Sequence, residues 1–229
     1  MTQPLHLGPL TLVLRQQTLL QLPERRIAPG EILTLMGPSG CGKSSLLAGL
    51  AGVLPPGGPL QLVGEIRLGT RLLSTLPAYQ RRIGMLFQED LLFAHLSVVE
   101  NLMFGMPAHI KGAARREQAQ QALTRVGLAA LGNRHTGALS GGQKARVSLL
   151  RTLLAEPDVI LLDEPFARLD KPLRAAFRTL VFEEIAGRAI PAILVSHDEE
   201  DAPATILDLA AMASPATRYP PISEDDPLV

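Results

Sequence analysis

The sequence predicts an α/β protein with a parallel central sheet, because short apolar runs alternate with stretches of helical character. Four runs have the length of buried strands, at 32–36, 83–87, 159–162 and 192–195. Polar residues or glycines follow each run, and open parallel sheets bind their ligands at the carboxyl ends of the strands. The function is therefore expected to lie in the loops that follow these strands.

The composition of the 229-residue chain limits what the protein can be. This length suits one substantial core, or a core with a small inserted subdomain. Lys and Arg number 22 and Asp and Glu also number 22, so no general positive field favours nucleic acid as a partner. The single cysteine, Cys41, excludes an internal disulfide framework, and no segment has the pattern of a signal peptide. A soluble cytoplasmic protein without nucleic acid is expected, with any membrane link made through a partner.

A glycine-rich turn after the first apolar run has the spacing of a phosphate-binding loop. It consists of Gly37, Pro38, Ser39, Gly40, Cys41, Gly42, Lys43 and Ser44, with Ser45 next in the helix. Its glycines let consecutive N–H groups point at a polyphosphate, and a helix N-terminus favours negative charge. Lys43 is expected to reach the β- and γ-phosphates, and Ser44 to bind Mg²⁺. A chance Gly-Ser turn is the bland alternative, whereas Ser45 excludes a dinucleotide fingerprint because a third glycine would be needed there.

The middle of the chain, from about residue 91 to 155, is mainly helical and interrupts the strand pattern. We expect one domain over 1–210, with its core at 1–90 and 156–210 and a helical subdomain inserted between them. Ser97 is expected to cap a helix together with Glu100, and Arg115 and Arg116 to lie on a solvated face. The run at 192–195 is expected to be the last core strand, and the Pro-rich acidic stretch 211–229 to be disordered.

A second glycine-rich helix start follows this insert. Its residues, after Leu139, are Ser140, Gly141, Gly142 and Gln143. The helix that they open carries Val147, Leu150 and Leu154 on one apolar stripe. One triphosphate needs only one such cradle, so the second raises a geometric question.

The order of these motifs resembles that of the ATP-binding subunits of ABC transporters, over about Leu10 to Ala210. The matching features are the loop 37–44, Gln88, the segment 139–143, Asp163 with Glu164, Leu169 with Asp170, and His197. The resemblance implies a P-loop NTPase with a RecA-like core, a small antiparallel β part and the helical insert. It also answers the geometric question: two copies pair head to tail, and Ser140 to Gln143 of one copy close on the ATP held by the other.

The same resemblance assigns roles to four polar residues at strand ends. Asp163 would hold Mg²⁺ together with Ser44, and Glu164 would activate the attacking water as general base. Gln88 would contact the metal or the water and sense the γ-phosphate, and a buried structural glutamine is the alternative. His197 would hydrogen-bond the γ-phosphate, although a single histidine is more often a satisfied core residue.

More narrowly, the chain resembles subunits of bacterial binding-protein-dependent importers. That likeness implies a peripheral protein on the cytoplasmic face of the inner membrane, working with a permease and indirectly with a solute-binding protein. It suggests a small solute such as thiamine. The partner surface is expected after Gln88, where most of the apolar side chains should be local core and the exposed remainder should form a docking groove for the permease, with pure packing as the alternative. These side chains are Leu91, Leu92, Phe93, Val98, Leu102, Met103 and Phe104. A non-transport ABC ATPase, a P-loop GTPase and a small-molecule kinase are the rival interpretations.

The sequence also departs from the family pattern at three places. Ala167 and Arg168 stand where the family often has a serine and a small residue. The stretch 12–16 lacks the aromatic residue on which the adenine usually stacks, and only Arg15 could replace it. The strands that usually follow the histidine are cut short, so no regulatory C-terminal domain is expected.

Overall fold

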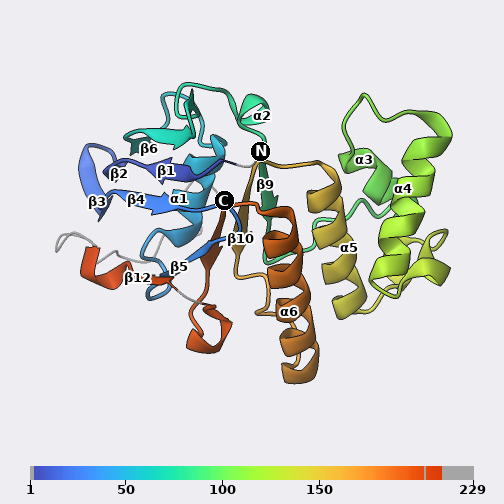
Figure 1. The fold of residues 1–229 in the computed structure, drawn as a ribbon. Coiled ribbons are helices and arrows are strands. Elements are labelled where there is room, and N and C mark those ends of the chain that lie inside the picture. The colour runs from blue at the N-terminus through green and yellow to red at the C-terminus, as the bar shows by residue number, and fades with distance from the viewer. Residues whose placement is uncertain (1–2, 204, 213–229) are drawn as a thin grey trace.

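The centre of the molecule is a parallel sheet, as the apolar runs indicate. The computed structural model describes residues 3–203 and 205–212. The strand order in this five-stranded sheet is β12-β5-β11-β10-β9 (Figure 1). Its strands are β5 (Ile32–Met36), β9 (Ile83–Leu86), β10 (Val159–Asp163), β11 (Ala192–Val195) and β12 (Thr205–Asp208). The expectation that 192–195 is the last core strand is wrong, because β12 pairs in parallel with β5 beyond it.

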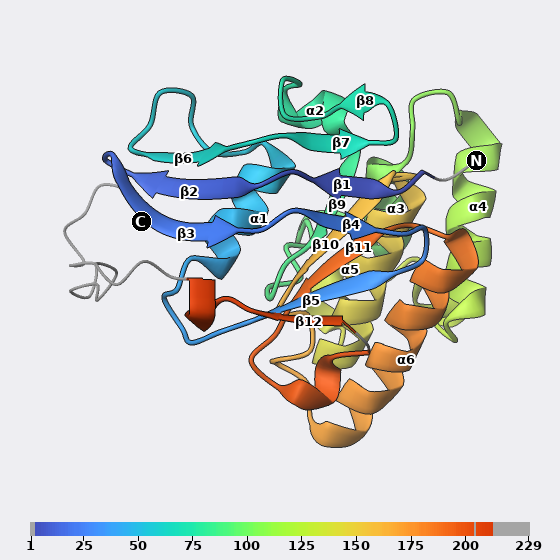
Figure 2. The same cartoon turned by 60° about the vertical axis from the view of Figure 1, so that its left-hand side comes forward.

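Antiparallel strands form the second part of the fold. One sheet has the order β4-β1-β7-β8 and another the order β3-β2-β6 (Figure 2). Their bounds are β1 (Leu5–Leu7), β2 (Leu10–Leu14), β3 (Gln17–Leu22), β4 (Arg25–Ile27), β6 (Leu60–Val63), β7 (Ile66–Leu68) and β8 (Arg71–Leu72). Together with the parallel sheet they confirm the α/β fold with a small antiparallel part.

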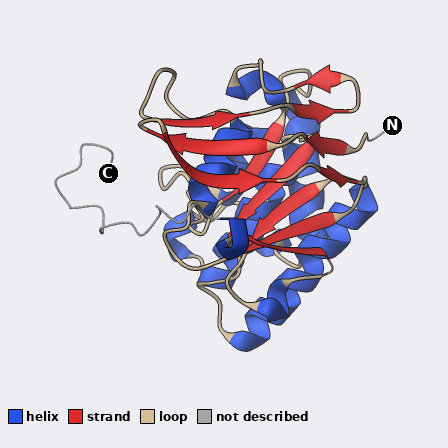
Figure 3. Cartoon of the chain, turned by 90° about the vertical axis from the view of Figure 1, so that its left-hand side faces the viewer, coloured by secondary structure: helices blue, strands red, loops and turns tan. Residues whose placement is uncertain are grey.

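The helices complete the layers, and Figure 3 shows them gathered mainly behind the strands. The α-helices are α1 (Lys43–Ala51), α2 (Ala78–Arg81), α3 (Val98–Gly105), α4 (Gly112–Arg125), α5 (Gly141–Leu154) and α6 (Lys171–Arg188). Short 3₁₀ helices are η1 (Ala129–Leu131), η2 (Thr136–Ala138), η3 (Glu199–Asp201) and η4 (Ala210–Met212). The described fold thus continues through Met212, and residues 213–229 of the expected tail lie outside the described residues.

The central strands are buried on both faces, and their alternation separates two apolar clusters. In β10, Val159 and Leu161 pack toward α1 and the antiparallel strands. Ile160 and Leu162, one position on, pack toward α5 and α6. Burial on both faces explains why β10 is apolar throughout instead of alternating with polar residues. Both clusters therefore pack against the strand that ends in Asp163.

Helices α3, α4 and α5 enclose a third apolar cluster, at the right of Figure 1. Val147 and Leu150 of α5 belong to it, whereas Leu149 and Leu153 face the parallel sheet, so α5 joins the two regions. Ser97 and Glu100 form the expected capping box at the start of α3. This packing supports our proposal of a helical subdomain at about 91–155.

Arg115 is not the solvated charge that the sequence suggested. Its guanidinium donates to the carbonyl oxygens of Met103, Met106 and Ile110, at and just beyond the end of α3. A cation beside carbonyls that lack helical partners satisfies them and complements the helix dipole. Arg116 does lie exposed, bonded to Asn133. Local contacts of this kind cannot be read from charge patterning alone.

No helix in the part of the chain that the structure describes is both long enough and apolar enough to cross a bilayer.

Candidate functional site

The loop between β5 and α1 has the conformation that its glycines were expected to allow. Gly42 occupies the N-cap position of α1 with φ 96°, and Gly40 has φ 80°. A Cβ on Gly42 would also lie 3.1 Å from Leu12, which packs under the loop from β2. Because a glycine offers no capping side chain, the first N–H groups of α1 stay open to a ligand.

Lys43 stabilises this loop from within. Its buried ammonium donates to the carbonyl oxygens of Gly37 at 2.9 Å and Pro38 at 3.0 Å. An ammonium has three protons, so one donor remains for a ligand in the loop. Pro38, Ser39 and Gly40 are exposed, whereas the Cys41 thiol is buried beneath them against Gly37. The backbone of Cys41, and not its side chain, therefore faces the cradle.

Ser44 and Asp163 bring two oxygen ligands together at the ends of different segments. The Ser44 hydroxyl donates to Oδ1 of Asp163 at 3.2 Å, across 119 positions of sequence. Burial raises the pKa of Asp163; Ser44 and the charge of Lys43 oppose this effect, and Glu164 adds to it. A cation at this point would favour the charged carboxylate. Two converging oxygens fit a hard cation such as Mg²⁺.

Protein side chains alone do not form a complete metal cage here. Within the described residues, no three His, Cys, Asp or Glu side chains lie close enough to hold an ion by themselves. Mg²⁺ is often held by one or two protein oxygens together with substrate phosphates and water. Ser44 and Asp163 fit that pattern, in which the nucleotide supplies part of the coordination.

Glu164 and His197 lie together at the ends of neighbouring strands. His197 Nδ1 is 3.4 Å from Glu164 Oε2. Glu164 has φ 45°, a left-handed conformation that is costly for a residue with a Cβ. Its N–H donates to the carbonyl of Val195 at 3.1 Å, and its carbonyl accepts from Ala167 in the next turn. The sheet therefore holds this carboxylate in a strained position, a detail that no sequence signal reveals.

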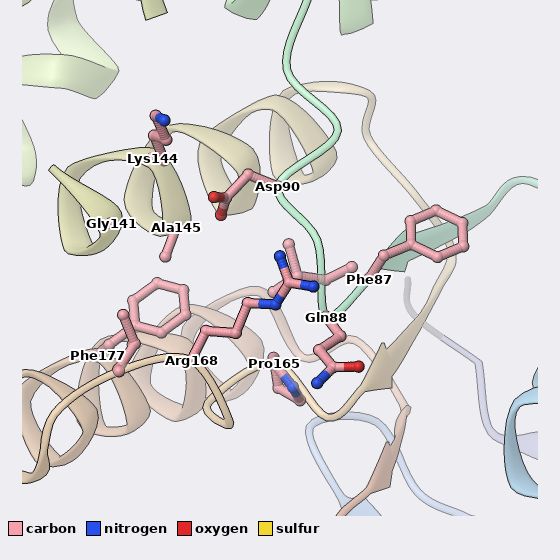
Figure 4. A pocket seen from close by; sticks show the side chains of 11 residues that line it. Phe87, Gln88, Asp90, Gly141, Lys144, Ala145, Pro165, Arg168 and Phe177 are labelled. Atoms are coloured by element: carbon pink, nitrogen blue, oxygen red, sulfur yellow. The ribbon is translucent and has the colours of Figure 1, made fainter. Parts of the chain in front are cut away.

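Gln88 lies exposed just after β9, so the alternative of a buried structural glutamine is wrong. It lines a pocket of about 280 Å³ with Pro165, Arg168 and Asp90 (Figure 4). Burial raises the pKa of Asp90 in this pocket, while Lys144, Arg168 and Arg151 oppose the shift. Arg168 also forms an ion pair of 2.9 Å with Glu89, both exposed. The unusual arginine after Ala167 thus joins the turn after β10 to the segment after β9.

The second glycine-rich start is built differently from the first. Ser140 caps α5: its hydroxyl oxygen accepts from the N–H of Gln143, and the Gln143 side chain accepts from the N–H of Ser140. The Ser140 oxygen accepts, so its proton remains available to a ligand. Gly141 borders the pocket of Gln88, which no residue of the loop 37–44 lines. The structure therefore joins Lys43, Ser44, Asp163, Glu164 and His197, and leaves Ser140 to Gln143 at another surface.

The expected place of an adenine-stacking residue is a tight turn. Arg15 and Gln16 both have positive φ, 46° and 71°, and both are exposed at the end of the β2–β3 hairpin. The N–H of Arg15 donates to the carbonyl of Pro59, which ties the turn to the loop before β6. The Arg15 side chain is free to move over a base, but the contacts of the turn do not direct it there.

Comparison with known proteins identifies the family. A family model described as "ABC transporter" matches residues 21–167. The ABC transporter ATP-binding protein YnjD of Escherichia coli (strain K12) is 47% identical over 201 residues, covering 83% of this chain and 92% of that protein. The Fe(3+) ions import ATP-binding protein FbpC of Agrobacterium fabrum is 42% identical over 177 residues, and that of Brucella abortus (strain 2308) is 40% identical. Those alignments cover 77% of this chain and 49% of FbpC, so this chain spans about half the length of the FbpC relatives.

A solved structure agrees with these relatives. It is an inward-facing conformation of a transporter described as metal-chelate type, with TM-score 0.73 and 26% identity, covering 90% of this chain and 80% of that chain. The family model spans more than half of the 229 residues. The chain therefore belongs to the ABC transporter family, whose ATP-binding subunits are ATPases that drive transport.

Proposed function

We propose that this protein binds and hydrolyses MgATP as the energising subunit of an importer, and that hydrolysis occurs between two copies of the chain. One observation carries the proposal. The loop lysine, the Ser44–Asp163 pair and the Glu164–His197 pair converge at the carboxyl edge of the parallel sheet. That arrangement combines a triphosphate cradle, a metal site and a base in one place.

Binding would depend on the loop 37–45. Backbone N–H groups at the start of α1 and the third proton of Lys43 would hold the β- and γ-phosphates. Ser44 and Asp163 would supply oxygens to Mg²⁺, which when bound neutralises charge on the phosphate oxygens. Gln88, in the segment after β9, is exposed and lines the same pocket as Pro165. From there its side chain would reach toward the metal or the water. We therefore assign Gln88 a sensing role and not a structural one.

Hydrolysis would depend on Glu164. In this mechanism its carboxylate accepts a proton from water while the water oxygen forms a bond to the γ-phosphorus. The bond between that phosphorus and the bridging oxygen breaks, and the electron pair leaves with ADP. His197, whose ring lies 3.4 Å from the Glu164 carboxylate, would donate a hydrogen bond to a γ-phosphate oxygen. The strained backbone of Glu164 supports an active rather than a packing role.

The second copy would contribute Ser140, Gly141, Gly142 and Gln143. Gly141 borders the pocket of Gln88 and not the loop 37–44 of the same chain. The free proton of Ser140 and the N-terminus of α5 are suited to the γ-phosphate of a nucleotide held by a partner chain. Asp170, exposed in the turn before α6, would lie near the same interface.

The permease would bind beside the helical region. Val98 and Leu102, which the sequence suggested for this surface, are fully buried in the local core. Of the side chains suggested for this surface, Leu91 and Phe104 are exposed, at 51% and 65%. Phe93 packs against Phe104 in a tilted arrangement, with ring centroids 4.6 Å apart and an interplanar angle of 59°, and the Arg151 guanidinium lies over Phe93. This exposed aromatic pair suits an apolar segment of the permease's cytoplasmic face.

The relatives' names support an importer of a small solute, because FbpC is named for Fe(3+) import. They give no support for a thiamine-like substrate, and we do not propose one. Attachment to a permease, which works with a solute-binding protein, would place the chain at the cytoplasmic face of the inner membrane. A balanced net charge supports partners other than nucleic acid.

A single substitution tests the proposed chemistry. Glu164→Gln keeps the size of the side chain but removes the base, so ATP turnover should fall by roughly 10²- to 10⁴-fold. The affinity for MgATP, measured with a fluorescent analogue, should remain within about threefold because Lys43 and Ser44 are unchanged. Glu184→Gln, on the far end of α6, is the matched control and should leave turnover intact. Full hydrolysis by the Glu164 variant would show that another group is the base.

A further inference from the structure

The His197 side chain depends on its backbone for its position. It is 58% exposed, so little packs around the ring apart from the Glu164 carboxylate. Its two neighbours in sequence, Ser196 and Asp198, are by contrast held by several bonds. The conformation of this short loop therefore decides where the imidazole lies.

A buried carboxylate anchors the loop from below. Asp201, at the end of η3, is only 2% exposed. Its Oδ2 accepts a bond of 2.8 Å from the Ser196 hydroxyl, and that hydroxyl accepts from the N–H of Asp198 at 3.1 Å. The residue before His197 and the residue after it are thus tied to one point. A buried carboxylate with few partners would be costly, so the remaining partners matter.

Arg174 supplies those partners from helix α6. Its Nε donates to Asp201 Oδ1 at 3.0 Å, and a second nitrogen donates to Oδ2 at 2.5 Å, a two-point contact. The same guanidinium lies 2.8 Å from Asp198 Oδ2. The hydrogen bonds that Arg174 donates to Asp201 raise the pKa of Arg174, so the guanidinium stays charged. Arg178, one turn later, adds a more distant contact of 3.5 Å to Asp201.

Arg174 lies one helical turn after Asp170. The Asp170 side chain caps α6 by accepting from the N–H of Leu173, and its carbonyl accepts from the N–H of Arg174. A continuous set of bonds therefore runs from the turn after Arg168, through Arg174 and Asp201, to the loop that carries His197. In the sequence, these contacts correspond to two arginines four positions apart, Arg174 and Arg178, and to the acidic run 198–201 directly after His197.

We propose that Arg174 and Asp201 are positioning residues for His197: they fix the loop 196–198 so that the imidazole stays beside Glu164. This inference rests on the proposed function, in which His197 acts on the γ-phosphate. Arg174 itself touches neither nucleotide nor water. Its effect reaches the reaction only through the histidine.

A double-mutant cycle tests the proposal on the full chain. Arg174→Gln should lower kcat for ATP by about 10- to 100-fold, because small displacements of a catalytic group have effects of that size. The KM for ATP should change by less than about threefold, since the loop 37–44 is untouched. Arg188→Gln is the matched control, because Arg188 pairs with Glu184 at the other end of the same helix. It should leave kcat within about twofold.

The decisive comparison is made with His197→Ala. If Arg174 acts through the histidine, adding Arg174→Gln to His197→Ala should cause no further loss beyond about twofold. If the double variant instead loses kcat by the product of the two single losses, the proposal is overturned and Arg174 is a merely structural residue. Loss of activity in His197→Ala with no loss in Arg174→Gln would also overturn it. Full activity of His197→Ala would instead contradict the role of His197 in the proposed function.

A second variant keeps the test open if Arg174→Gln does not fold. Ser196→Ala removes one hydroxyl and leaves the Arg174–Asp201 pair in place, so the fold should tolerate it. It should lower kcat by a few-fold in the wild-type background and have no effect in His197→Ala. An equal effect in both backgrounds would contradict the positioning role.

Discussion

The glycine-rich N-termini of α1 and α5 look alike in sequence, yet they are capped differently in the structure. At α1 the N-cap is Gly42, in a left-handed conformation, and no side chain caps the N–H groups that follow it. At α5 the N-cap is Ser140, and a reciprocal capping box satisfies the N–H groups of Ser140 and Gln143. Glycine content alone therefore does not identify a phosphate cradle. The residue at the N-cap position also matters, because a serine there occupies some of the N–H groups that a glycine leaves open.

This difference suggests that the N-termini of α1 and α5 act in different steps. The open start of α1, with Lys43 beneath it, would bind the triphosphate by itself. The capped start of α5 would keep its shape without ligand and add its contacts only when a second chain presents a nucleotide. Substitutions at equivalent positions should therefore affect different steps.

The largest expected effect follows loss of the lysine at the open start. Lys43→Ala removes a buried ammonium and its bonds to Gly37 and Pro38, so MgATP affinity should fall by about 100-fold or more. Lys144→Ala, in the first turn of α5, is the matched control and should leave the affinity of the dilute chain unchanged. Titration with a fluorescent nucleotide measures both. Equal losses would erase the distinction between the two helix starts.

An intermediate effect is expected at the capped start. Ser140→Ala should cost about 1 kcal/mol of stability, and so should Ser97→Ala, which removes the matching cap of α3. Only the Ser140 variant should also lower ATP turnover, by about tenfold, because only its hydroxyl would meet a nucleotide. Thermal unfolding and steady-state hydrolysis of both variants make the comparison. A similar loss of ATP turnover in Ser140→Ala and Ser97→Ala would show that Ser140 acts only as a helix cap.

The smallest expected effect concerns the base of the nucleotide. The exposed turn at Arg15 and Gln16 offers no aromatic ring, so binding should depend mainly on the triphosphate. GTP should therefore support hydrolysis within about tenfold of ATP, since a missing stacking contact is worth roughly 1 kcal/mol. Competition between the two nucleotides measures the ratio. A far stronger preference for ATP would point to a residue that reads adenine.

Much of this site was predictable because its residues occur in short, local patterns. The loop 37–45, the strand ending in Asp163 and Glu164, and the cap at Ser97 all depend on neighbours a few positions away. The fold class follows from four apolar runs in the same way. Strand β12 was missed because it is short and has only one buried residue, Leu207, so its pattern resembles a loop.

The remaining features depend on contacts between distant segments. The pairs Arg168–Glu89 and Arg174–Asp201 join positions 79 and 27 residues apart, and no local pattern specifies them. The left-handed backbone of Glu164 is imposed by the bond to Val195 and the turn that follows. Likewise, the sequence does not show which apolar side chains near α3 are local core, as Val98 and Leu102 are, because helix packing decides which of them remain exposed.

The central claim is that the open start of one chain and the capped start of another enclose the same nucleotide. Size-exclusion chromatography of Glu164→Gln with MgATP tests it most directly, because blocked hydrolysis lets the closed state accumulate. We expect a nucleotide-dependent dimer, and a monomer when Ser140→Arg is added to the same chain. A Glu164→Gln chain that binds MgATP yet stays monomeric at every concentration, or a dimer that persists with Ser140→Arg, would contradict the account.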